Sequence, residues 1–418
     1  MTTQPPSLAD LTRTFGRIGL LSFGGPAAQM ALMHRTLVDE RGWLTEREYL
    51  SALSFCMLLP GPEAMQLATW SGWRLHGTVG GLIAGGLFVL PGAVVVLALA
   101  MAYASFGQVP LVQALFLGVQ AAVVAIVIEA LLRVSRRALK GRGALLIAAA
   151  AFAGLFFLNL PFPVIILAAG LVGYATSRGE TGPLPPPASV AATVRAVLIW
   201  GAIWLLPLAA LWLFEGGLLA EIGLFFSQLA VFTFGGAYAV LAWMTQAVVE
   251  DKGWLTLPQM MDGLGLAETT PGPLILVTEF VGYLAAYREG GVWFGLAGAV
   301  VTLWMTFAPC FLWIFAGAPW IARITADPRL AGALSAIMAA VVGVIANLSL
   351  WFALHVLFDD VGRFSAGPLT LIAPDPSSLN LTALALSAAA AWMLLVRHWS
   401  LAVVLPVCAL AAAAAAVI

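Results

Sequence analysis

Charged side chains are scarce in this chain of 418 residues. Lysine and arginine number 19 and aspartate and glutamate 20, so charged residues make up 9% of the sequence. Soluble domains have roughly 25%. Hydrophobic residues make up 62%, which is enough for about a dozen spanning helices at about 20 residues each. The sequence therefore predicts an all-α polytopic membrane protein with about 11 to 13 membrane segments.

Several patterns that would indicate other functions are also missing. The three cysteines and four histidines are scattered and form no disulfide framework, CxxC pattern or HExxH pattern. The net charge is −1 and no long basic run occurs, which argues against nucleic-acid binding. The polar N-terminus lacks the basic and apolar regions of a cleaved signal peptide. We therefore expect no metal, no cofactor and no enzymatic activity.

Length and interruption locate the membrane segments, because the apolar stretches are hydrophobic on all sides. They run over residues 11–33, 50–73, 78–104, 111–134, 144–159, 161–176, 196–214, 218–244, 259–286, 292–320, 331–357, 379–396 and 399–418. A Pro-rich linker follows the first six, so we expect a first repeat at 1–176, the linker plus one connecting transmembrane helix at 177–217, and a second repeat at 218–418. Whether 11–33 and 50–73 cross the membrane or form re-entrant hairpins stays open, although loop charge favours hairpins.

Three short motifs occur twice, and each second copy lies 211 residues after the first. They are a Phe-Gly-Gly motif, a Gly-Trp-Leu-Thr motif and a Pro-Gly-Pro motif, within residues 22–26 and 233–237, 41–45 and 252–256, and 60–62 and 271–273. Three motifs in one register indicate two homologous halves.

Loop charge predicts that the two halves are inverted in the membrane. The basic loop at 133–142 corresponds to the acidic segment 358–367, and one connecting helix lies between the halves. Inverted repeats with glycine- and proline-broken segments at equivalent positions are typical of secondary transporters.

Both Phe-Gly-Gly and Pro-Gly-Pro interrupt apolar segments, where unpaired backbone groups are costly unless they line a cavity. We interpret each break as the start of a half-helix whose free N–H groups and positive dipole end face an anion at mid-membrane. The alternative is a simple kink or a close helix crossing. The candidate substrate-binding residues are Phe23, Gly24, Gly25, Pro60, Gly61, Pro62, Gln66, Phe234, Gly235, Gly236, Thr269, Thr270, Pro271, Gly272 and Pro273.

Carboxyl groups inside the apolar segments are a second signal, because burying a charge in lipid is costly. Glu63 directly follows the first Pro-Gly-Pro, and Glu268 precedes the second. We expect these two residues to couple anion movement to protons; the alternative is that they cap helix ends. Glu129 and Glu279 are further intramembrane carboxyls to which the sequence assigns no role.

Three basic residues lie at the margins of the broken segments. Arg17, Arg74 and Lys252 are expected to attract the anion electrostatically. The alternative is that they are ordinary interface residues whose charged ends reach the aqueous phase.

The same motifs resemble those of a known family, the chromate ion transporters. The first half is similar to the family's pattern at Ser22–Pro26, Glu40–Leu44 and Leu59–Glu63, and the second half at Phe234–Tyr238 and Glu268–Pro273. The similarity covers nearly the whole chain, in the family's long form. It implies a carrier of the bacterial inner membrane that expels chromate and confers chromate resistance, with sulfate as a chemically similar competitor.

Residues and resemblance together predict secondary active export of chromate. A carrier for sulfate or another oxyanion stays open as the alternative, because a backbone site does not distinguish two tetrahedral dianions of similar size. The inverted repeat argues against a channel, and the lack of a cofactor fingerprint or a nucleophile–base pair argues against a membrane enzyme. The sequence leaves open whether the chain is a monomer or a homodimer.

Overall fold

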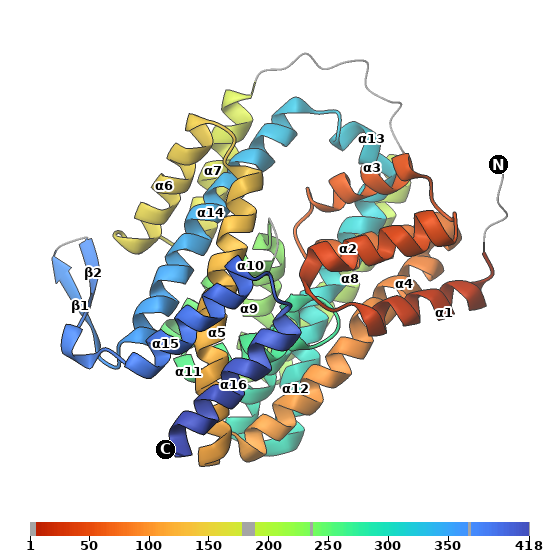
Figure 1. The fold of residues 1–418 in the computed structure, drawn as a ribbon. Helices are drawn as coiled ribbons and strands as arrows, with labels where there is room; N and C mark the ends of the chain where they lie inside the picture. Colours follow the sequence, from red (N-terminus) through yellow and green to blue (C-terminus); the bar gives the residue numbers. More distant parts are fainter. Residues whose placement is uncertain (1–5, 178–188, 235–236, 367–368, 418) are drawn as a thin grey trace. The chain divides into compact units, whose positions relative to one another are not determined.

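The structure, a computed structural model, describes residues 6–177, 189–234, 237–366 and 369–417, and nearly all of them are helical (Figure 1). Within these residues, five helical stretches are long and apolar enough to cross a membrane: Glu63–Phe106, Pro110–Ala138, Val190–Phe214, Leu274–Ile324 and Pro328–Leu357. Several shorter apolar helices accompany them. The chain is an all-α polytopic membrane protein, as the composition predicts.

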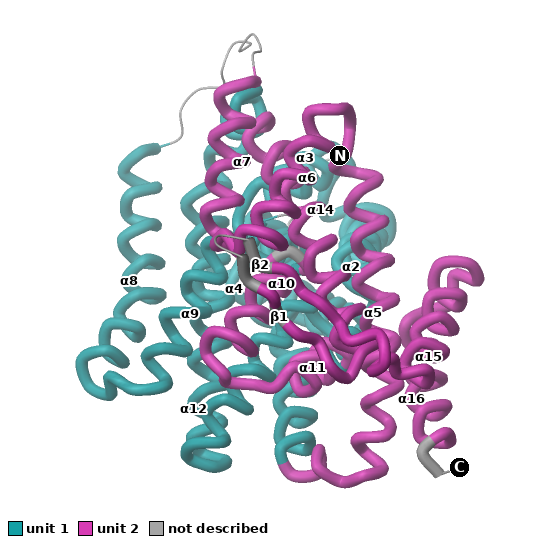
Figure 2. Tube along the Cα trace, turned by 90° about the vertical axis from the view of Figure 1, so that its left-hand side faces the viewer, with its two compact units in different colours: residues 1–104, 179–237, 266–330 teal, residues 105–178, 238–265, 331–418 magenta. Residues whose placement is uncertain are grey.

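The chain forms two compact units, which Figure 2 shows in different colours. Unit 1 comprises residues 1–104, 179–237 and 266–330, and unit 2 comprises residues 105–178, 238–265 and 331–418. Each unit therefore takes segments from both sides of the expected linker, of which residues 178–188 lie outside the described part of the chain. The repeat boundaries and the inverted orientation of the halves stay predictions.

Unit 1 contains two long helical stretches that fold back on themselves. Its elements are α1 (Leu8–Leu21), α2 (Gly25–His34), η1 (Arg35–Glu40), α3 (Glu46–Cys56), α4 (Glu63–Phe106), α8 (Val190–Phe214), α9 (Leu218–Phe232), η3 (Leu274–Leu276), α12 (Val277–Gly317), η4 (Ala318–Trp320) and α13 (Ile321–Ile324). The backbone leaves the helical range at Gly77 in α4 and at Gly291 in α12. The limbs of α12 meet at Gly282, where a Cβ would lie 2.0 Å from Thr302 Oγ1. Such close contact through small residues is typical of membrane helices.

The connecting helix α8 packs on α9 and α12 of unit 1. Pro207 lies inside α8 and has no N–H, so the carbonyl of Ile203, one turn earlier, loses its intrahelical donor. Trp304 on α12 replaces that donor, because its Nε1 donates to Ile203 O at 3.0 Å. A proline that would otherwise weaken α8 thus provides an acceptor that attaches the helix to α12.

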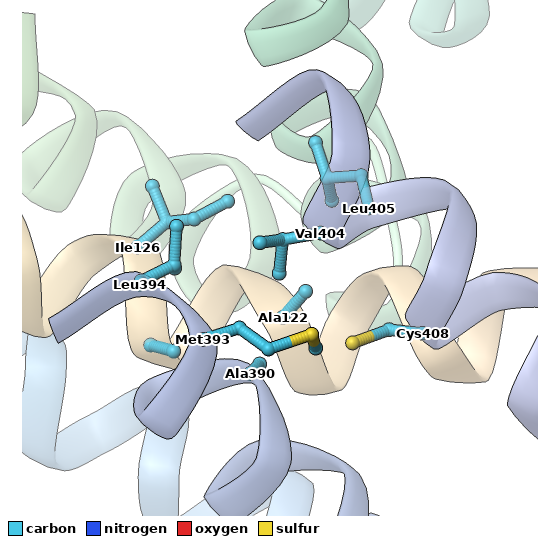
Figure 3. Close-up of a cluster of buried hydrophobic side chains, with 9 residues drawn as sticks. Ala122, Ile126, Ala390, Met393, Leu394, Val404, Leu405 and Cys408 are labelled. Carbon is cyan, nitrogen blue, oxygen red and sulfur yellow. The ribbon is translucent and has the colours of Figure 1, made fainter. Parts of the chain in front are cut away.

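Unit 2 is organised around α5 and α14. Its elements, wholly or for most of their length, are α5 (Pro110–Ala138), α6 (Arg142–Phe156), α7 (Phe162–Thr176), α10 (Ala237–Gln246), η2 (Ala247–Asp251), α11 (Leu257–Thr269), α14 (Pro328–Leu357), β1 (Val361–Ala366), β2 (Leu369–Pro374), η5 (Pro376–Ser378), α15 (Leu381–Ala391), η6 (Trp392–Val396) and α16 (Leu401–Val417). Figure 3 shows Ala122 and Ile126 of α5 among buried side chains from α15, η6 and α16. In the same unit α14 packs closely on α6, since a Cβ at Gly343 would lie 2.2 Å from Ala148 O.

A small antiparallel hairpin contains the only two β-strands among the described residues. Strands β1 and β2 pair with Val361 opposite Pro374 and Ala366 opposite Leu369. From the sequence, this segment is expected to be a loop at the position equivalent to the basic loop at 133–142 of the first half. Its apolar residues are typical of a strand, but the run is too short for this pattern to distinguish a strand from a loop.

Candidate functional site

The first Phe-Gly-Gly motif forms a turn between two helices of unit 1. Helix α1 ends at Leu21 and α2 begins at Gly25, with Gly24 between them in the left-handed region at φ 86°. Pro26 stands in the first turn of α2, where its missing N–H costs nothing because that group would have no intrahelical acceptor. The motif therefore starts a new helix inside an apolar segment.

Two backbone hydrogen bonds cross between the repeated motifs. Gly61 N–H donates to Thr233 O at 2.7 Å, and Gly272 N–H donates to Ser22 O at 2.9 Å. All four residues belong to unit 1. The two donors lie 211 residues apart, and so do the two acceptors, so the two bonds are equivalent in the two halves. The Pro-Gly-Pro of each half is thus attached to the Phe-Gly-Gly segment of the other, an arrangement that we call the crossing.

Two buried glutamines hold the carbonyls at the crossing. Gln66 Nε2 donates to Pro60 O at 2.6 Å, while Gln29 Nε2 donates to Gly272 O at 2.7 Å and to Ser22 O at 3.3 Å. Each break frees backbone carbonyls, so an amide N–H is the group needed there. The Oε1 atoms of both glutamines are buried and have no hydrogen-bond partner among the described residues.

A small cavity lies beside the crossing, and four helical segments begin at it. It is lined by Pro26, Gln29, Pro62, Glu63, Ala64, Thr233, Ala237, Pro273, Leu274 and Ile275, all of unit 1. Pro26 lies at the start of α2, Glu63 begins α4, Leu274 begins η3, and Ala237 is the first described residue of α10. First-turn N–H groups lack intrahelical acceptors, and a helix N-terminus has positive partial charge. The cavity is therefore suited to a negatively charged or hydrogen-bond-accepting ligand.

Glu63 is the one titratable side chain among the described residues that line the cavity. The cavity volume is about 20 Å³, which is room for about one water molecule. An anion of several heavy atoms can enter only if the surrounding helix starts move apart. In this geometry the cavity is therefore closed to such an anion.

Comparison with known proteins identifies the family of this chain. The sequence pattern of the chromate transporter family matches residues 9–174 and 220–416. The chain belongs to the chromate transporter family. This is a family of transporters, not of enzymes. No solved structure shows a significant match to the chain.

Three relatives carry names that describe chromate transport. The chain is 32% identical over 390 residues to a probable chromate transport protein of Synechococcus elongatus, which covers 91% of this chain and 95% of that protein. It is 32% identical over 368 residues to the chromate transport protein of Cupriavidus metallidurans, with 84% of each chain covered. For the chromate transport protein of Pseudomonas aeruginosa the identity is 33% over 352 residues, covering 82% of this chain and 80% of that protein.

Most of the predicted glycine and proline residues of this chromate transporter family member meet in unit 1. Pro62 and Pro273 line the cavity, Gly61 and Gly272 make the crossing bonds, and Gly24, Gly25 and Pro60 stand beside them. Pro271 packs on α4, because a Cβ at Gly92 would lie 2.2 Å from Pro271 O. Phe23 is 48% exposed in its turn, and Phe234 is half-buried after Thr233. Gly235 and Gly236 lie outside the described residues.

The predicted neutral donors make hydrogen bonds within the protein. Thr269 Oγ1 donates to Leu266 O at 2.8 Å, and Thr270 Oγ1 donates to Ala267 O at 3.0 Å, each within its own helix end. The amide of Gln66 is engaged with Pro60 O. In this closed form none of the three lines the cavity.

The predicted cations are not among the residues that line the cavity. Arg17 is exposed on α1, and Arg74 is exposed and paired with Glu48, with 2.8 Å between Nη2 and Oε1. Lys252, in unit 2, has its ammonium 4.7 Å from the ring centroid of Trp254. No lysine, arginine or histidine occurs among the described lining residues. An attracting role for these three cations stays a prediction.

The four carboxyl groups singled out in the sequence have different surroundings in the structure. Glu63 lines the cavity, whereas Glu268 is half-buried near the end of α11 and is not among the lining residues. Glu129 is paired with Arg133 one turn later on α5. Glu279, which the sequence singles out without a role, is 1% exposed in the first turn of α12.

Gln29 is one of several lining residues that are not among the candidates from the sequence. It is 1% exposed, follows Pro26 by three residues and is the polar side chain of an otherwise apolar stretch. A buried amide in an apolar helix requires hydrogen-bond partners, and this was the available signal. The partner carbonyl of Gly272 lies far away in sequence, so its identity could not be inferred.

Proposed function

We propose that this protein is a secondary active transporter that exports chromate across the bacterial inner membrane, with the anion bound by helix N-termini from both halves. The observation that carries the proposal is the convergence of the starts of α2, α4, α10 and η3 on one cavity. Membership of the family and the names of three relatives support chromate as the anion.

Helix starts suit a tetrahedral oxyanion for an electrostatic reason. Their N–H groups donate to the anion's oxygens, and the aligned peptide dipoles offset its charge without a fixed cation. A site without a bound cation also releases its anion more readily, as a transporter requires. The small closed cavity implies that binding and release accompany a movement of the helix starts, which is how a carrier differs from an open pore.

We further propose that anion movement is coupled to protons. Glu63 lines the cavity, and an ionised carboxyl there would repel a dianion in surroundings of low polarity. Binding of chromate is therefore favoured when Glu63 is protonated, and release is favoured when that proton leaves. Glu268, half-buried shortly before the second Pro-Gly-Pro, is the second proposed proton-coupling residue.

Uptake into everted membrane vesicles tests the proposal. Vesicles that contain the full chain are given chromate or sulfate, with and without an imposed pH gradient, beside vesicles that lack the protein. We expect chromate uptake that a gradient with the acidic side outside the vesicles accelerates, and loss of this acceleration in Glu63→Gln. A rate that the gradient leaves unchanged in both proteins would refute proton coupling. Uptake of sulfate, with chromate as a weak competitor, would establish the alternative oxyanion carrier.

A further inference from the structure

Glu279 is a buried carboxyl that the proposed transport cycle does not yet use. It is 1% exposed, and its Oε2 atom has no hydrogen-bond partner among the described residues. An unpaired charge is very costly in such a place, whereas a protonated carboxyl is tolerated. Ionisable residues inside membrane segments are rare and are usually part of a pathway for substrate, ions or protons. A purely structural role would be filled at lower cost by glutamine or an apolar residue.

Glu279 lies one helical turn from the cavity. It follows Ile275, a lining residue, by four positions, so the two side chains share a face of the continuous segment formed by η3 and α12. It also lies in the first turn of α12, where the positive end of the helix stabilises an ionised carboxyl. Burial opposes ionisation and the helix end favours it, and this balance allows a group to gain and lose a proton.

The charged groups on neighbouring elements leave Glu63 as the relevant partner. The helices that pack on α12 are α8 and α9, whose spans include Arg195 and Glu221, while η3 and η4 have no ionisable side chain. Arg195 lies close in sequence to Thr193, which accepts from Trp320 beyond the far end of α12. Glu221 lies two residues before Gly223, where a Cβ would lie 3.4 Å from Val301 on the second limb of α12.

The remaining nearby groups are those of α4 and of α12 itself. On α4, Arg74 and His76 stand at the other end of the first limb from Glu63. Tyr103 of α4 has its ring centroid 5.2 Å from that of Phe280, the residue next to Glu279. On α12, Arg288 and Glu289 stand at the far end of the first limb from Glu279, and Tyr283 is one turn away. Glu279 forms no ion pair among the described residues.

We propose that Glu279 is a further proton-binding residue of the transport cycle, which holds a proton in the closed form and exchanges it with the cavity as the anion binds and leaves. The inference rests on the proposed function, since it assigns a further group to the proton coupling suggested for Glu63. The proton passes between two carboxyls and the intervening water, so no oxidant or other reactant is required. Glu63 exchanges protons directly at the anion, and Glu279 stores one a helical turn away.

Infrared difference spectroscopy on the reconstituted full chain tests this assignment directly. Addition of chromate should change the C=O stretching bands of protonated carboxyls, and Glu279→Gln should remove the one of these changes that belongs to Glu279. A pH dye trapped in the same vesicles reports the protons that move with each chromate. We expect fewer protons per chromate in Glu279→Gln and pH-driven uptake slower by roughly tenfold or more.

Two further variants keep the test decisive. Glu289→Gln, an exposed carboxyl on the same helix, should retain the infrared band and the proton count of the wild type. Glu279→Asp stays ionisable, so it should retain a shifted band even if Glu279→Gln does not fold. A wild-type band and proton count in Glu279→Gln, or no band in a folded Glu279→Asp, would overturn the inference while wild-type chromate uptake still supports the proposed function. Absence of chromate uptake in the wild type would overturn both.

Discussion

The two halves of the chain share backbone geometry at the crossing but differ in the chemistry of their helix starts. Two positions in each half, offset by 211 residues, show the difference: the first half has Glu63 and Ala68, and the second has Leu274 and Glu279. At these two equivalent positions each half has one carboxyl, the first half at the first position and the second half at the second. In the proposed transport cycle, the equivalent backbone would let both halves present helix starts to one anion, and the unlike side chains would divide the proton chemistry between them.

The largest effects are expected from breaking the shared backbone. Gly61 and Gly272 have φ of 122° and 89°, which costs a residue with a side chain about 1–2 kcal/mol. A Cβ at Gly61 would also lie 2.7 Å from Gln66 Nε2, and one at Gly272 would lie 2.9 Å from Leu276 Cδ1. We expect Gly61→Ala and Gly272→Ala each to reduce chromate uptake to background, as measured in everted vesicles.

Gly77→Ala is the matched control for these two variants. Gly77 also has positive φ, but a Cβ there would meet nothing within 4 Å. It should lower the melting temperature slightly and leave most uptake intact. If Gly77→Ala abolishes uptake as completely as the two crossing variants, general backbone strain rather than the crossing is responsible.

Moving a carboxyl from one half to the other sharpens the comparison. Glu63 and Leu274 both line the cavity at equivalent positions. Glu63→Leu should lower pH-driven uptake by roughly a hundredfold, because a group that transfers protons is lost. Adding Leu274→Glu should restore part of that rate, since the carboxyl returns to the same cavity from the other half. No recovery in a folded double variant would show that the carboxyl must stand on α4.

The sequence predicts the components of the site better than their contacts. Repeated motifs at one offset identify Gly61, Gly272 and their neighbours, because breaks in apolar helices are visible in composition alone. The carboxyl groups are harder to predict: Glu63 lines the cavity, but the roles of Glu268 and Glu279 stay predictions, and the burial of Glu279 could not be inferred from the sequence. Gln29 and the partner of Arg74 depend on contacts between distant segments, and no local pattern encodes those.

A smaller effect is expected at α8, which has no counterpart in the first half and packs on α9 and α12. Trp304→Phe leaves the Ile203 carbonyl without a donor and should destabilise unit 1 by about 1–3 kcal/mol. Pro207→Ala restores an N–H within α8, so the double variant should regain most of that stability. The melting temperatures of the four proteins in detergent measure this, and equal losses in the single and double variants would contradict the role given to Pro207.

The smallest effect concerns an ion pair that only the first half has. His34 hydrogen-bonds to Glu46 at 2.6 Å and also faces Asp39, and these partners raise the pKa of His34 above its usual 6.5 despite slight desolvation. The equivalent residues of His34 and Glu46 in the second half are Thr245 and Leu257, which cannot form such a pair. A raised histidine pKa stabilises the fold below pH 6.5, and this contribution is lost as the pH rises through the higher folded value. Because the pair is largely exposed, we expect less than about 1 kcal/mol.

The melting temperature of the wild type should therefore fall toward that of His34→Gln over this range, and Glu46→Gln should remove most of the pH dependence. A difference between wild type and His34→Gln that does not change with pH would mean that His34 acts through packing on Tyr49, whose ring centroid lies 5.0 Å away, rather than through charge.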